Sequence, residues 1–555
     1  MTETLATVPK APVNDRRRAG WALAAAATLL PFLSELPVDF DRLAPLAVLP
    51  AVWLGRNIGG TAAGNSRVDK TDRWLLFLAI GVALASAALS AHPIPAFVHS
   101  ASLAWILAGA FLARRLSQDL FAMRLVLGGI TLGATLGCLA VWIGWKDGTP
   151  ISAFPFYGHG RLFGLHQMIG TMTALAWLSI TAEKTAERHA VMAVAILNCG
   201  GMLWSGGRAP LLGFFVGVLA WGCALGAGQR RAFAQRLGIV LAGGLLLSLL
   251  RWSPEPYLGW WGAIARSAAA TSVDELSSTR LSFWQVTWQE FLKAPWIGHG
   301  ADAYRFIQPK QDGSQPHNWV LQLLVDFGLL GGVAVGLLLV RQAWLGLRGS
   351  GIASPESSVR CAAGAGFVAC ISAGLLDGVF YHAILLVPAC LLAGISGGAT
   401  FGERAEARPP RPRLIRGASA LALTAATALL LAHSSVVGLF LIGSPPATPE
   451  APAARWVHVF PSSTFGIIRW LNAWRTTRPD DALAWAKWAQ QHSDNPAELH
   501  VYVAVIYANR GDFAAAGAQV ADALRKCHIR TKPKLLELQQ AIAAAQAQAG
   551  TSVPK

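Results

Sequence analysis

Long continuous runs of apolar residues, separated by short polar stretches, dominate the first 443 positions of the chain. A helix that crosses a bilayer needs about 20 mostly apolar residues. Because the runs are continuous and do not alternate between apolar and polar residues, they predict membrane-spanning helices and not the strands of a barrel. We count thirteen runs of about this length or somewhat shorter, to within about one, at residues 20–38, 43–55, 74–91, 95–113, 123–145, 164–181, 190–205, 209–227, 237–251, 319–340, 361–376, 380–400 and 417–443.

The longest segment between two apolar runs is 252–317, and it contains six tryptophans. Connections longer than about 12–15 residues are usually functional or disordered, and this content of aromatic residues argues against a disordered linker. Apolar residues at helical spacing predict an amphipathic helix over 273–293. We expect this helix to lie on the membrane surface or to cap the bundle.

The pattern changes after residue 443. A proline-rich stretch at 444–462 is interpreted as a linker, and residues 463–549 have the spacing of soluble amphipathic helices. Residues 497–524 fit the tetratricopeptide template of about 34 residues, whereas the window before them fits it poorly. One good repeat is too little to stand alone, so we expect this unit to pack against the membrane domain or a partner. A plain helical hairpin domain is the simpler alternative.

The composition agrees with a membrane protein. Of the 555 residues, 54% are hydrophobic and 14% are charged, whereas a soluble domain has roughly 25% charged residues. A single water-soluble globule and a disordered chain are therefore both excluded. The seven cysteines show no disulfide or zinc-binding pattern. Because further apolar runs follow the first one and no small-residue cleavage site separates them, we expect no cleaved signal peptide.

The net charge of +16 at first suggests nucleic-acid binding. The basic residues, however, lie mainly in alternate loops, and the intervening short loops hold only Arg42, Lys146, Arg161 and Arg208. This distribution is the positive-inside pattern, so it predicts a cytoplasmic N-terminus and places segments 252–317 and 444–555 on the opposite face. We therefore interpret the charge as topology, with membrane lipids and no nucleic acid as partners.

Two arginines and a histidine are expected together on the non-cytoplasmic face. Arg208 ends a Ser-Gly-Gly-Arg turn, Arg280 begins the amphipathic helix, and His317 precedes the tenth run. Taken singly, they also fit an interfacial anchor, a solvated surface residue and a structural hydrogen-bond donor. Together they suit transfer from a phosphate-activated, membrane-bound donor to a hydroxyl. Guanidinium groups bind phosphate oxygens and stabilise charge on a leaving group, and imidazole can deprotonate or orient the attacking hydroxyl.

The loops show no acidic pair or other metal-binding pattern, so we expect a metal-independent reaction without a cofactor.

The order of these motifs resembles the bacterial O-antigen ligase and O-antigen polymerase superfamily, over roughly residues 150–330. The residues that carry the resemblance are Ser205-Gly-Gly-Arg208, Arg280-x3-Trp284, Pro295-Trp-Ile-Gly-His-Gly300 and His317-Asn318-x2-Leu321-Gln322-x3-Asp326-x-Gly328-x2-Gly331. Gly160-Arg-Leu-Phe-Gly164 is similar to an earlier element of the family, but it continues with Leu165-His-Gln-Met168 in place of an Asn-Pro-Asn-like stretch.

The resemblance implies a bacterial inner-membrane protein of about a dozen spans, similar in fold to C-type glycosyltransferases, with one large periplasmic loop. It implies that Arg208 and Arg280 bind the undecaprenyl diphosphate of a lipid-linked glycan donor and that His317 acts near the acceptor hydroxyl. It further implies inversion at the anomeric carbon. We expect four more residues to contribute to substrate binding, namely Arg161, Trp284, His299 and Asn318.

We therefore expect an all-α protein of 12 to 13 spans with a transmembrane glycan-transferase domain at 1–443, a linker at 444–462 and a periplasmic, tetratricopeptide-like domain at 463–555. The expected activity is that of an O-antigen ligase with lipid A-core as the acceptor. A polysaccharide polymerase and a protein O-oligosaccharyltransferase use the same chemistry and remain open, because the sequence does not reveal the acceptor. The last domain is expected to dock a periplasmic protein or the acceptor.

Two functions from other classes remain as alternatives. A transporter or flippase requires paired ionisable residues near mid-membrane and inverted repeats. Only Asp326 and Asp377 stand out as such residues, and we see no repeat. The helical tail also suits a non-enzymatic assembly scaffold.

Overall fold

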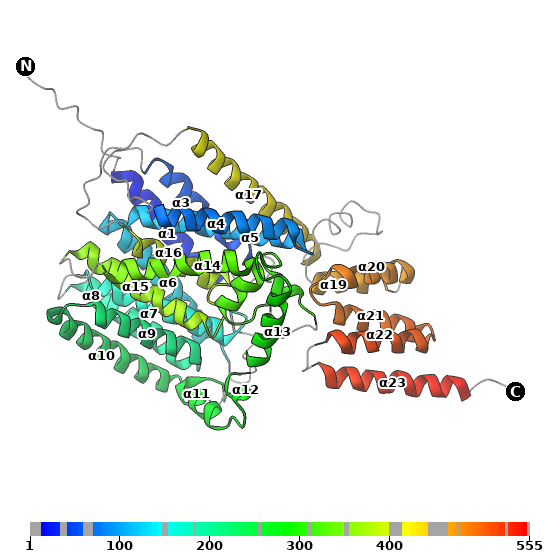
Figure 1. Ribbon diagram of the computed structural model, residues 1–555. Helices are drawn as coiled ribbons and strands as arrows, with labels where there is room; N and C mark the ends of the chain where they lie inside the picture. Colours follow the sequence, from blue (N-terminus) through cyan, green and yellow to red (C-terminus); the bar gives the residue numbers. More distant parts are fainter. Residues whose placement is uncertain are drawn as a thin grey trace, which may run out of the picture.

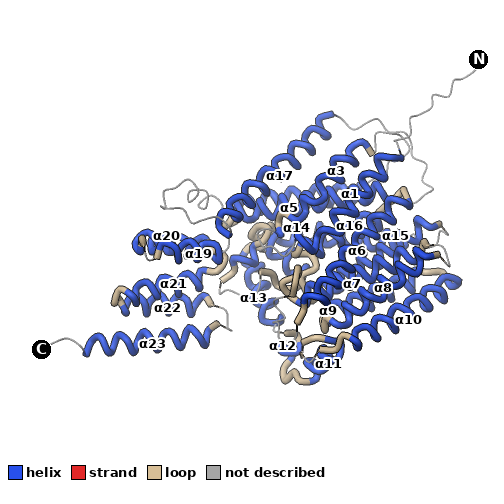
Figure 2. The backbone as a smooth tube through the Cα atoms, turned by 180° about the vertical axis from the view of Figure 1, so that it is seen from behind, coloured by secondary structure: helices blue, strands red, loops and turns tan. Residues whose placement is uncertain are grey.

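The computed structural model describes residues 13–33, 41–58, 70–146, 154–181, 185–253, 255, 257–278, 280–308, 314–348, 354–398, 413–441, 464–475, 477–527 and 531–551. All regular secondary structure within these ranges is helical (Figure 2). The all-α expectation is therefore confirmed.

Each of the thirteen apolar runs overlaps a helix. These are α1 (Val13–Leu33), the short pair η1 (Ala44–Val48) and α3 (Leu49–Leu54), α4 (Lys70–Leu89), α5 (Pro93–Leu116), α6 (Leu120–Gly144), α7 (Gly160–Leu178), α8 (Ala186–Trp204), α9 (Arg208–Ala224), α10 (Ala227–Leu250), α14 (Trp319–Arg348), α15 (Pro355–Gly374), α16 (Ala383–Ser396) and α17 (Arg413–Leu441). Within the described ranges, seven helices are long and apolar enough to cross a membrane, namely α4, α5, α6, α10, α14, α15 and residues Gly417–Val436 of α17. The count of twelve to thirteen spans stays a prediction.

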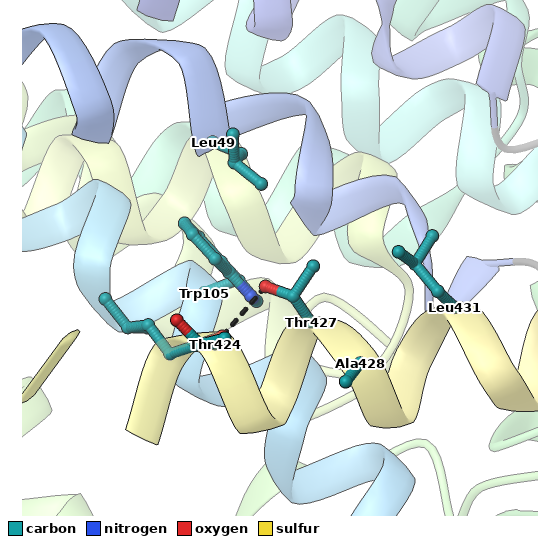
Figure 3. A pocket seen from close by; sticks show the side chains of 7 residues that line it. Leu49, Trp105, Thr424, Thr427, Ala428 and Leu431 are labelled. Atoms are coloured by element: carbon teal, nitrogen blue, oxygen red, sulfur yellow. Dashed lines mark hydrogen bonds between the residues drawn. The ribbon is translucent and has the colours of Figure 1, made fainter. Parts of the chain in front are cut away.

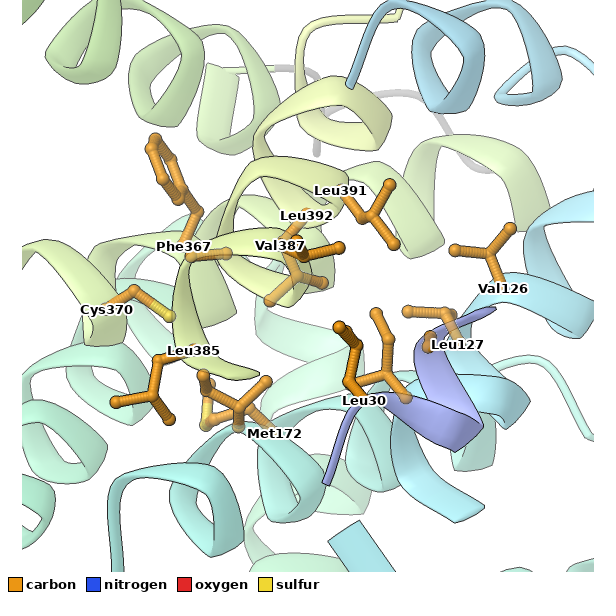
Figure 4. Close-up of a cluster of buried hydrophobic side chains, with 14 of the residues drawn as sticks. Leu30, Val126, Leu127, Met172, Phe367, Cys370, Leu385, Val387, Leu391 and Leu392 are labelled. Atoms are coloured by element: carbon orange, nitrogen blue, oxygen red, sulfur yellow. The ribbon is translucent and has the colours of Figure 1, made fainter. Parts of the chain in front are cut away.

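The core of the bundle lies where α1, α6, α7, α15 and α16 meet, and apolar side chains from all five fill it (Figure 4). Glycines at four-residue spacing bring neighbouring helices close together. A Cβ on Gly129 or Gly133 of α6 would collide with the backbone of α1, and a Cβ on Gly213 or Gly217 of α9 would collide with carbonyl oxygens of α15. Because lipid is as apolar as a side chain, close packing of small residues is a main source of helix association in membranes.

The large loop is helical, as expected. It contains α11 (Gly259–Ala268), α12 (Val273–Leu276), α13 (Arg280–Lys293) and η4 (Ala303–Phe306). The single helix expected over 273–293 is interrupted, because Ser278 adopts a positive φ of 60° between α12 and α13. Helix α13 runs across one end of the bundle (Figure 1) and buries Phe283, Thr287 and Phe291. Trp288 and Leu292 remain exposed.

Helix α14 is broken at Gly328, whose φ is 63° and ψ is −168°. The loop after α13 packs into this break. Leu329 N–H donates to the Pro295 carbonyl (2.7 Å), and Gly300 N–H donates to the Asp326 carbonyl (2.9 Å). A Cβ on Gly298 or Gly328 would collide with the opposing backbone. The glycines of these two motifs are therefore required by a close backbone approach and by positive φ angles.

The C-terminal unit consists of α19 (Thr464–Trp474), α20 (Pro479–His492), α21 (Pro496–Asn509), α22 (Phe513–Lys526) and α23 (Lys532–Thr551). Each helix packs against the next one, and α19 also packs against α17. The unit lies beyond the end of the bundle that α13 crosses (Figures 1 and 2). The expected linker at 444–462 lies outside the described residues, and the tetratricopeptide assignment stays a prediction.

Candidate functional site

Arg280 and His317 meet at a shared carboxylate, that of Asp377. Arg280 Nη2 lies 3.1 Å from Asp377 Oδ2, and His317 Nδ1 lies 3.0 Å from Asp377 Oδ1. All three side chains are buried. Residues separated by up to 97 positions are therefore joined in one hydrogen-bonded group.

Three elements bring this group together at the end of the bundle. Arg280 is the first residue of α13, His317 lies just before α14, and Asp377 lies in the 375–382 loop between α15 and α16. The Gly378 N–H donates to Asp377 Oδ1 (2.9 Å), and the Asp377 N–H donates to the carbonyl of Ala373 at the end of α15 (3.0 Å). The carboxylate is therefore oriented by backbone contacts as well as by its basic partners.

Arg208 lies beside this group and orients the chain that leads to Arg280. It is the first residue of α9, and its guanidinium donates to Ser267 Oγ (3.2 Å), the Leu276 carbonyl (2.6 Å) and Ser278 Oγ (2.7 Å). The pKa of Arg280 is lowered by burial and by the positive charges of Arg161 and Arg208, while Asp377 opposes this effect. Arg208 therefore lies close enough to act electrostatically on the same site.

Arg161 is the fourth basic residue of the site. It lies in the first turn of α7, where its N–H donates to Nδ1 of the capping residue His159 (3.0 Å). Its charge contributes to the pKa values of Arg280, His317 and Asp377. Within the described part of the chain, its guanidinium has no hydrogen-bond partner, so it can bind an anion without breaking a protein contact. We call Arg161, Arg208, Arg280, His317 and Asp377 the Arg–His cluster.

The turn before α7 is anchored inside the bundle. Tyr157 OH lies 2.9 Å from His166 Nδ1 and fits against Gly137, where no Cβ could be accommodated. His166 is fully buried. It therefore fixes the chain that presents Arg161 instead of facing a substrate.

The protonation of His317 follows from its surroundings. Burial lowers its pKa, Arg161 and Arg280 lower it further, and Asp377 only partly opposes them, so the imidazole is neutral at pH 7. Burial also disfavours the charged form of Asp377, but the hydrogen bond from His317 and the positive charges of Arg161 and Arg280 hold the pKa of that carboxyl well below its usual range. The ionised carboxylate accepts a hydrogen bond from Nδ1–H, which leaves Nε2 free to accept a proton.

Two of the expected substrate-binding residues lie next to His317, and each has a polar side-chain atom bonded to the protein backbone. Trp284 Nε1 donates to the Pro316 carbonyl (3.0 Å), so it holds the segment that carries His317. Asn318 Oδ1 accepts hydrogen bonds from the N–H groups of Val320 (3.0 Å) and Leu321 (3.1 Å). It therefore caps the N-terminus of α14.

His299 belongs to the packing around the break in α14. Its Nε2 lies 2.9 Å from the Glu290 carbonyl, and its N–H donates to the Val325 carbonyl. Among the described residues, none of these contacts reaches the Arg–His cluster. A role for His299, Trp284 or Asn318 in substrate binding stays a prediction.

Asp377 is the member of the candidate site that sequence reasoning missed, since the sequence indicated it only for the transport alternative. Its position at the end of an apolar run, on the face that carries His317, is the signal that could have indicated it. The other acid considered for transport, Asp326, accepts hydrogen bonds from Ala303 N–H (3.0 Å) and Gln322 Nε2 (2.7 Å). Asp326 therefore stabilises the break in α14.

The structure also contains an apolar hollow of about 380 Å³ between α3, α5 and α17 (Figure 3). Leu49, Trp105 and a stretch of α17 line it, and Thr424 and Thr427 are its hydroxyl-bearing residues. It has no titratable group in its lining, so it is not the candidate site. Within the described ranges, no three His, Cys, Asp or Glu side chains gather into a group that could hold a metal ion.

Residues 193–336 match the model of the O-antigen ligase family. The matched segment includes Arg208, Arg280 and His317, so the resemblance inferred from the motifs is confirmed there. The match supports a glycan transferase of ligase or polymerase type, acting on lipid-linked substrates in a multi-pass inner-membrane protein. No curated protein matches the chain.

Proposed function

We propose that this protein transfers a glycan from undecaprenyl diphosphate to a hydroxyl acceptor on the periplasmic face of the inner membrane, with lipid A-core as the acceptor. The observation that carries the proposal is the convergence of Arg280 and His317 on Asp377, with Arg161 and Arg208 beside them. This arrangement combines an anion-binding group with a neutral imidazole base, which are the two functions that such a transfer requires.

In the proposed reaction, His317 Nε2 takes the proton of the acceptor hydroxyl while that oxygen attacks the anomeric carbon of the glycan. The bond between the anomeric carbon and the diphosphate oxygen breaks, and undecaprenyl diphosphate leaves with the electron pair. Arg161 and Arg280 stabilise the charge that develops on the leaving oxygens. Attack from the side opposite the diphosphate inverts the anomeric configuration.

Asp377 supports both the removal of the acceptor proton by His317 and the stabilisation of the leaving diphosphate by Arg280. It holds the Nδ1–H tautomer of His317 and stabilises the imidazolium that forms, as the carboxylate does in a Ser-His-Asp triad. It also fixes one edge of the Arg280 guanidinium. Arg280 Nε is buried and has no hydrogen-bond partner among the described residues.

A polysaccharide polymerase or protein O-oligosaccharyltransferase would use the same residues with a different acceptor. The deciding experiment supplies the purified protein with undecaprenyl-diphosphate-linked glycan and, separately, with lipid A-core, a second lipid-linked glycan or a protein acceptor. Product with lipid A-core alone is expected. Product with only another acceptor would change the subclass, and no product with any acceptor would contradict a glycan transferase.

A further inference from the structure

The C-terminal unit is joined to the large loop by a partly buried ion pair. Arg305, in η4, places its Nε 2.9 Å from Asp494 Oδ2. Asp494 lies in the turn between α20 and α21. The Arg305 side chain is 8% exposed and that of Asp494 is 17% exposed, so the pair is largely withdrawn from solvent.

The same guanidinium faces a second carboxylate inside the membrane domain. Arg305 Nη1 lies 3.8 Å from Asp302 Oδ2. Asp302 Oδ1 lies 3.0 Å from Arg42 Nη2 and accepts a hydrogen bond from Tyr381 OH at 2.7 Å. Arg42 and Arg305 thus share the Asp302 carboxylate, and Arg305 also pairs with Asp494 of the C-terminal unit.

Tyr381 connects this network to the Arg–His cluster. Both Tyr381 and Asp377 belong to the 375–382 loop, which is tightened by hydrogen bonds from Val379 N–H to Asp377 O (3.0 Å) and from Tyr381 N–H to Gly378 O (3.3 Å). The next residue, His382, has its Nε2 3.1 Å from Gln315 Nε2. One short loop therefore holds the segment that carries His317 at two points, and Asp302 at a third.

Apolar contacts seat the C-terminal unit beside this network. The His92 ring stacks on Phe306 with centroids 4.1 Å apart, which fixes η4 to the start of α5. Ile94, at the start of α5, packs into a cluster formed mainly by α19, α20 and α21. The C-terminal unit is thus in apolar contact with the membrane domain at the start of α5.

We propose that the C-terminal unit is a positioning part of the transfer site, in which Asp494, through Arg305, holds the loop that carries His317 against the 375–382 loop. This inference rests on the proposed function, because the site that it positions is the Arg–His cluster. The positioning residues are Arg305 and Asp494, and neither contacts the cluster directly. A tail that served only to recruit a partner would leave transfer to a purified lipid acceptor independent of this ion pair.

Removal of Asp494 should disturb the site because it changes the balance of charge around the buried Arg305 guanidinium. Removal of Asp494 takes away the carboxylate 2.9 Å from Arg305 and leaves the 3.8 Å contact with Asp302, a carboxylate that Arg305 shares with Arg42. Removing one partner of a buried charge is destabilising, so η4 should move to hydrate Arg305. The contacts of Gln315 and His317 with the 375–382 loop would then weaken.

The test compares full-length Asp494→Asn with Asp480→Asn. Asp480 is also an acid of the C-terminal unit, but its side chain is 87% exposed in its ion pair with Arg510. Hydrogen exchange reports on residues 303–308 and 314–318, single-turnover transfer measures the chemical step, and a filter assay with undecaprenyl diphosphate measures donor binding. For Asp494→Asn we expect exchange in these segments to be at least ~10-fold faster and transfer at least ~10-fold slower, the effect of about 1.4 kcal/mol.

Donor binding should stay within about twofold, because Arg161, Arg208 and Arg280 lie on α7, α9 and α13, outside the segments that are expected to move. Asp480→Asn should change none of the three measurements. Asp494→Glu, which keeps the charge, should restore most of the transfer rate. This split between the chemical step and binding, together with rescue by glutamate, distinguishes positioning from a general loss of stability.

Two results would overturn the proposal. One is equal exchange in Asp494→Asn and Asp480→Asn, and the other is faster exchange without slower transfer. If the unmodified protein transfers no glycan, the proposed function fails on that result alone. The exchange comparison then still decides whether the ion pair holds the loop.

Discussion

At the scale of single residues, the site depends on how one buried carboxylate is shared. Asp377 accepts hydrogen bonds from Arg280, from His317 and from the Gly378 N–H. A carboxylate has about four lone-pair positions, and these contacts occupy three of them. Asp377 therefore fixes the relative positions of the base and of one phosphate-binding group.

Asp377→Asn should slow transfer by about 10²- to 10⁴-fold, because an amide can stabilise the wrong tautomer of His317 and cannot stabilise the imidazolium. Single-turnover kinetics with saturating donor measures the effect. Glu275→Gln, at an exposed acid that bonds to Thr271, is the control and should be neutral. An Asp377→Asn variant as fast as this control would contradict the assigned role.

The pH dependence should reflect neutral His317. Its lowered pKa keeps Nε2 unprotonated at neutral pH, so transfer should be constant there and should fall only below the ordinary histidine value of about 6.5. Asp377 stays ionised throughout this range. In Arg161→Ala, a positive charge that depresses the His317 pKa is absent, so the acid limb should move to higher pH. A profile that falls near pH 8 as pH is lowered would contradict the neutral base.

Replacement of Arg161 and replacement of Arg208 should have different effects on thermal stability. The Arg161 guanidinium has no hydrogen-bond partner in the described part of the chain, whereas that of Arg208 bonds to the segment before Arg280. Arg161→Ala should weaken donor binding by roughly 10- to 100-fold, the value of a charge-assisted hydrogen bond, without changing thermal stability. Arg208→Ala should also lower the unfolding temperature. Titration with the donor measures the affinity of each variant, and thermal unfolding in detergent measures its unfolding temperature.

At the scale of elements, the apolar periodicity predicted where helices form but not how they break. The runs of α4 to α10 and of α14 to α17 are visible in the sequence because membrane helices must satisfy all backbone groups internally. The break at Gly328 and the interruption at Ser278 depend on partners far along the chain, so local pattern could not reveal them.

The same limit applies to the prediction of the candidate site. Arg208, Arg280 and His317 were identifiable from their residue type and motif, but Asp377 required the pairing of α13, α14 and the 375–382 loop.

The close approach between the 294–302 loop and α14 can be tested by replacing a glycine of the loop with alanine, which adds one methyl group. Gly298→Ala should lower the free energy of unfolding by more than about 1 kcal/mol, since Gly298 has a φ of 72° and its Cβ would collide with the Asp326 carbonyl. Gly238→Ala in α10, where nothing lies within 4 Å, should instead stabilise the helix by up to about 1 kcal/mol. Thermal unfolding in matched detergent compares them. Equal effects would contradict the interlocked arrangement.

At the scale of the whole molecule, the two ends of the bundle have different roles. One end carries the Arg–His cluster, α13 and the C-terminal unit. At the other end, Asp72 of α4 bonds to Arg114 of α5 (3.2 Å) and Arg341 of α14 (2.7 Å). Arg341 lies 22 residues after Trp319 at the start of α14, which corresponds to roughly 33 Å at 1.5 Å per residue, or about one bilayer core.

This arrangement predicts which face each end occupies. By the positive-inside pattern, Asp480→Cys in the C-terminal unit should react with a membrane-impermeant maleimide added to spheroplasts. Arg348→Cys, at the exposed end of α14, should react only after the membrane is lysed. Labelling of both residues at once, or in the reverse order, would contradict the predicted orientation.

The interlock at the break in α14 has a consequence for anyone who recombines this protein with a relative. Residues 295–300 and 325–330 complete each other's backbone hydrogen bonds, so neither stretch can be exchanged without the other. A chimera that takes residues 295–300 from a relative and keeps residues 325–330 of this protein, or the reverse, would pair two backbones whose hydrogen bonds need not match. The smallest exchangeable block therefore extends from Pro295 through Gly331, and it carries His317 with it.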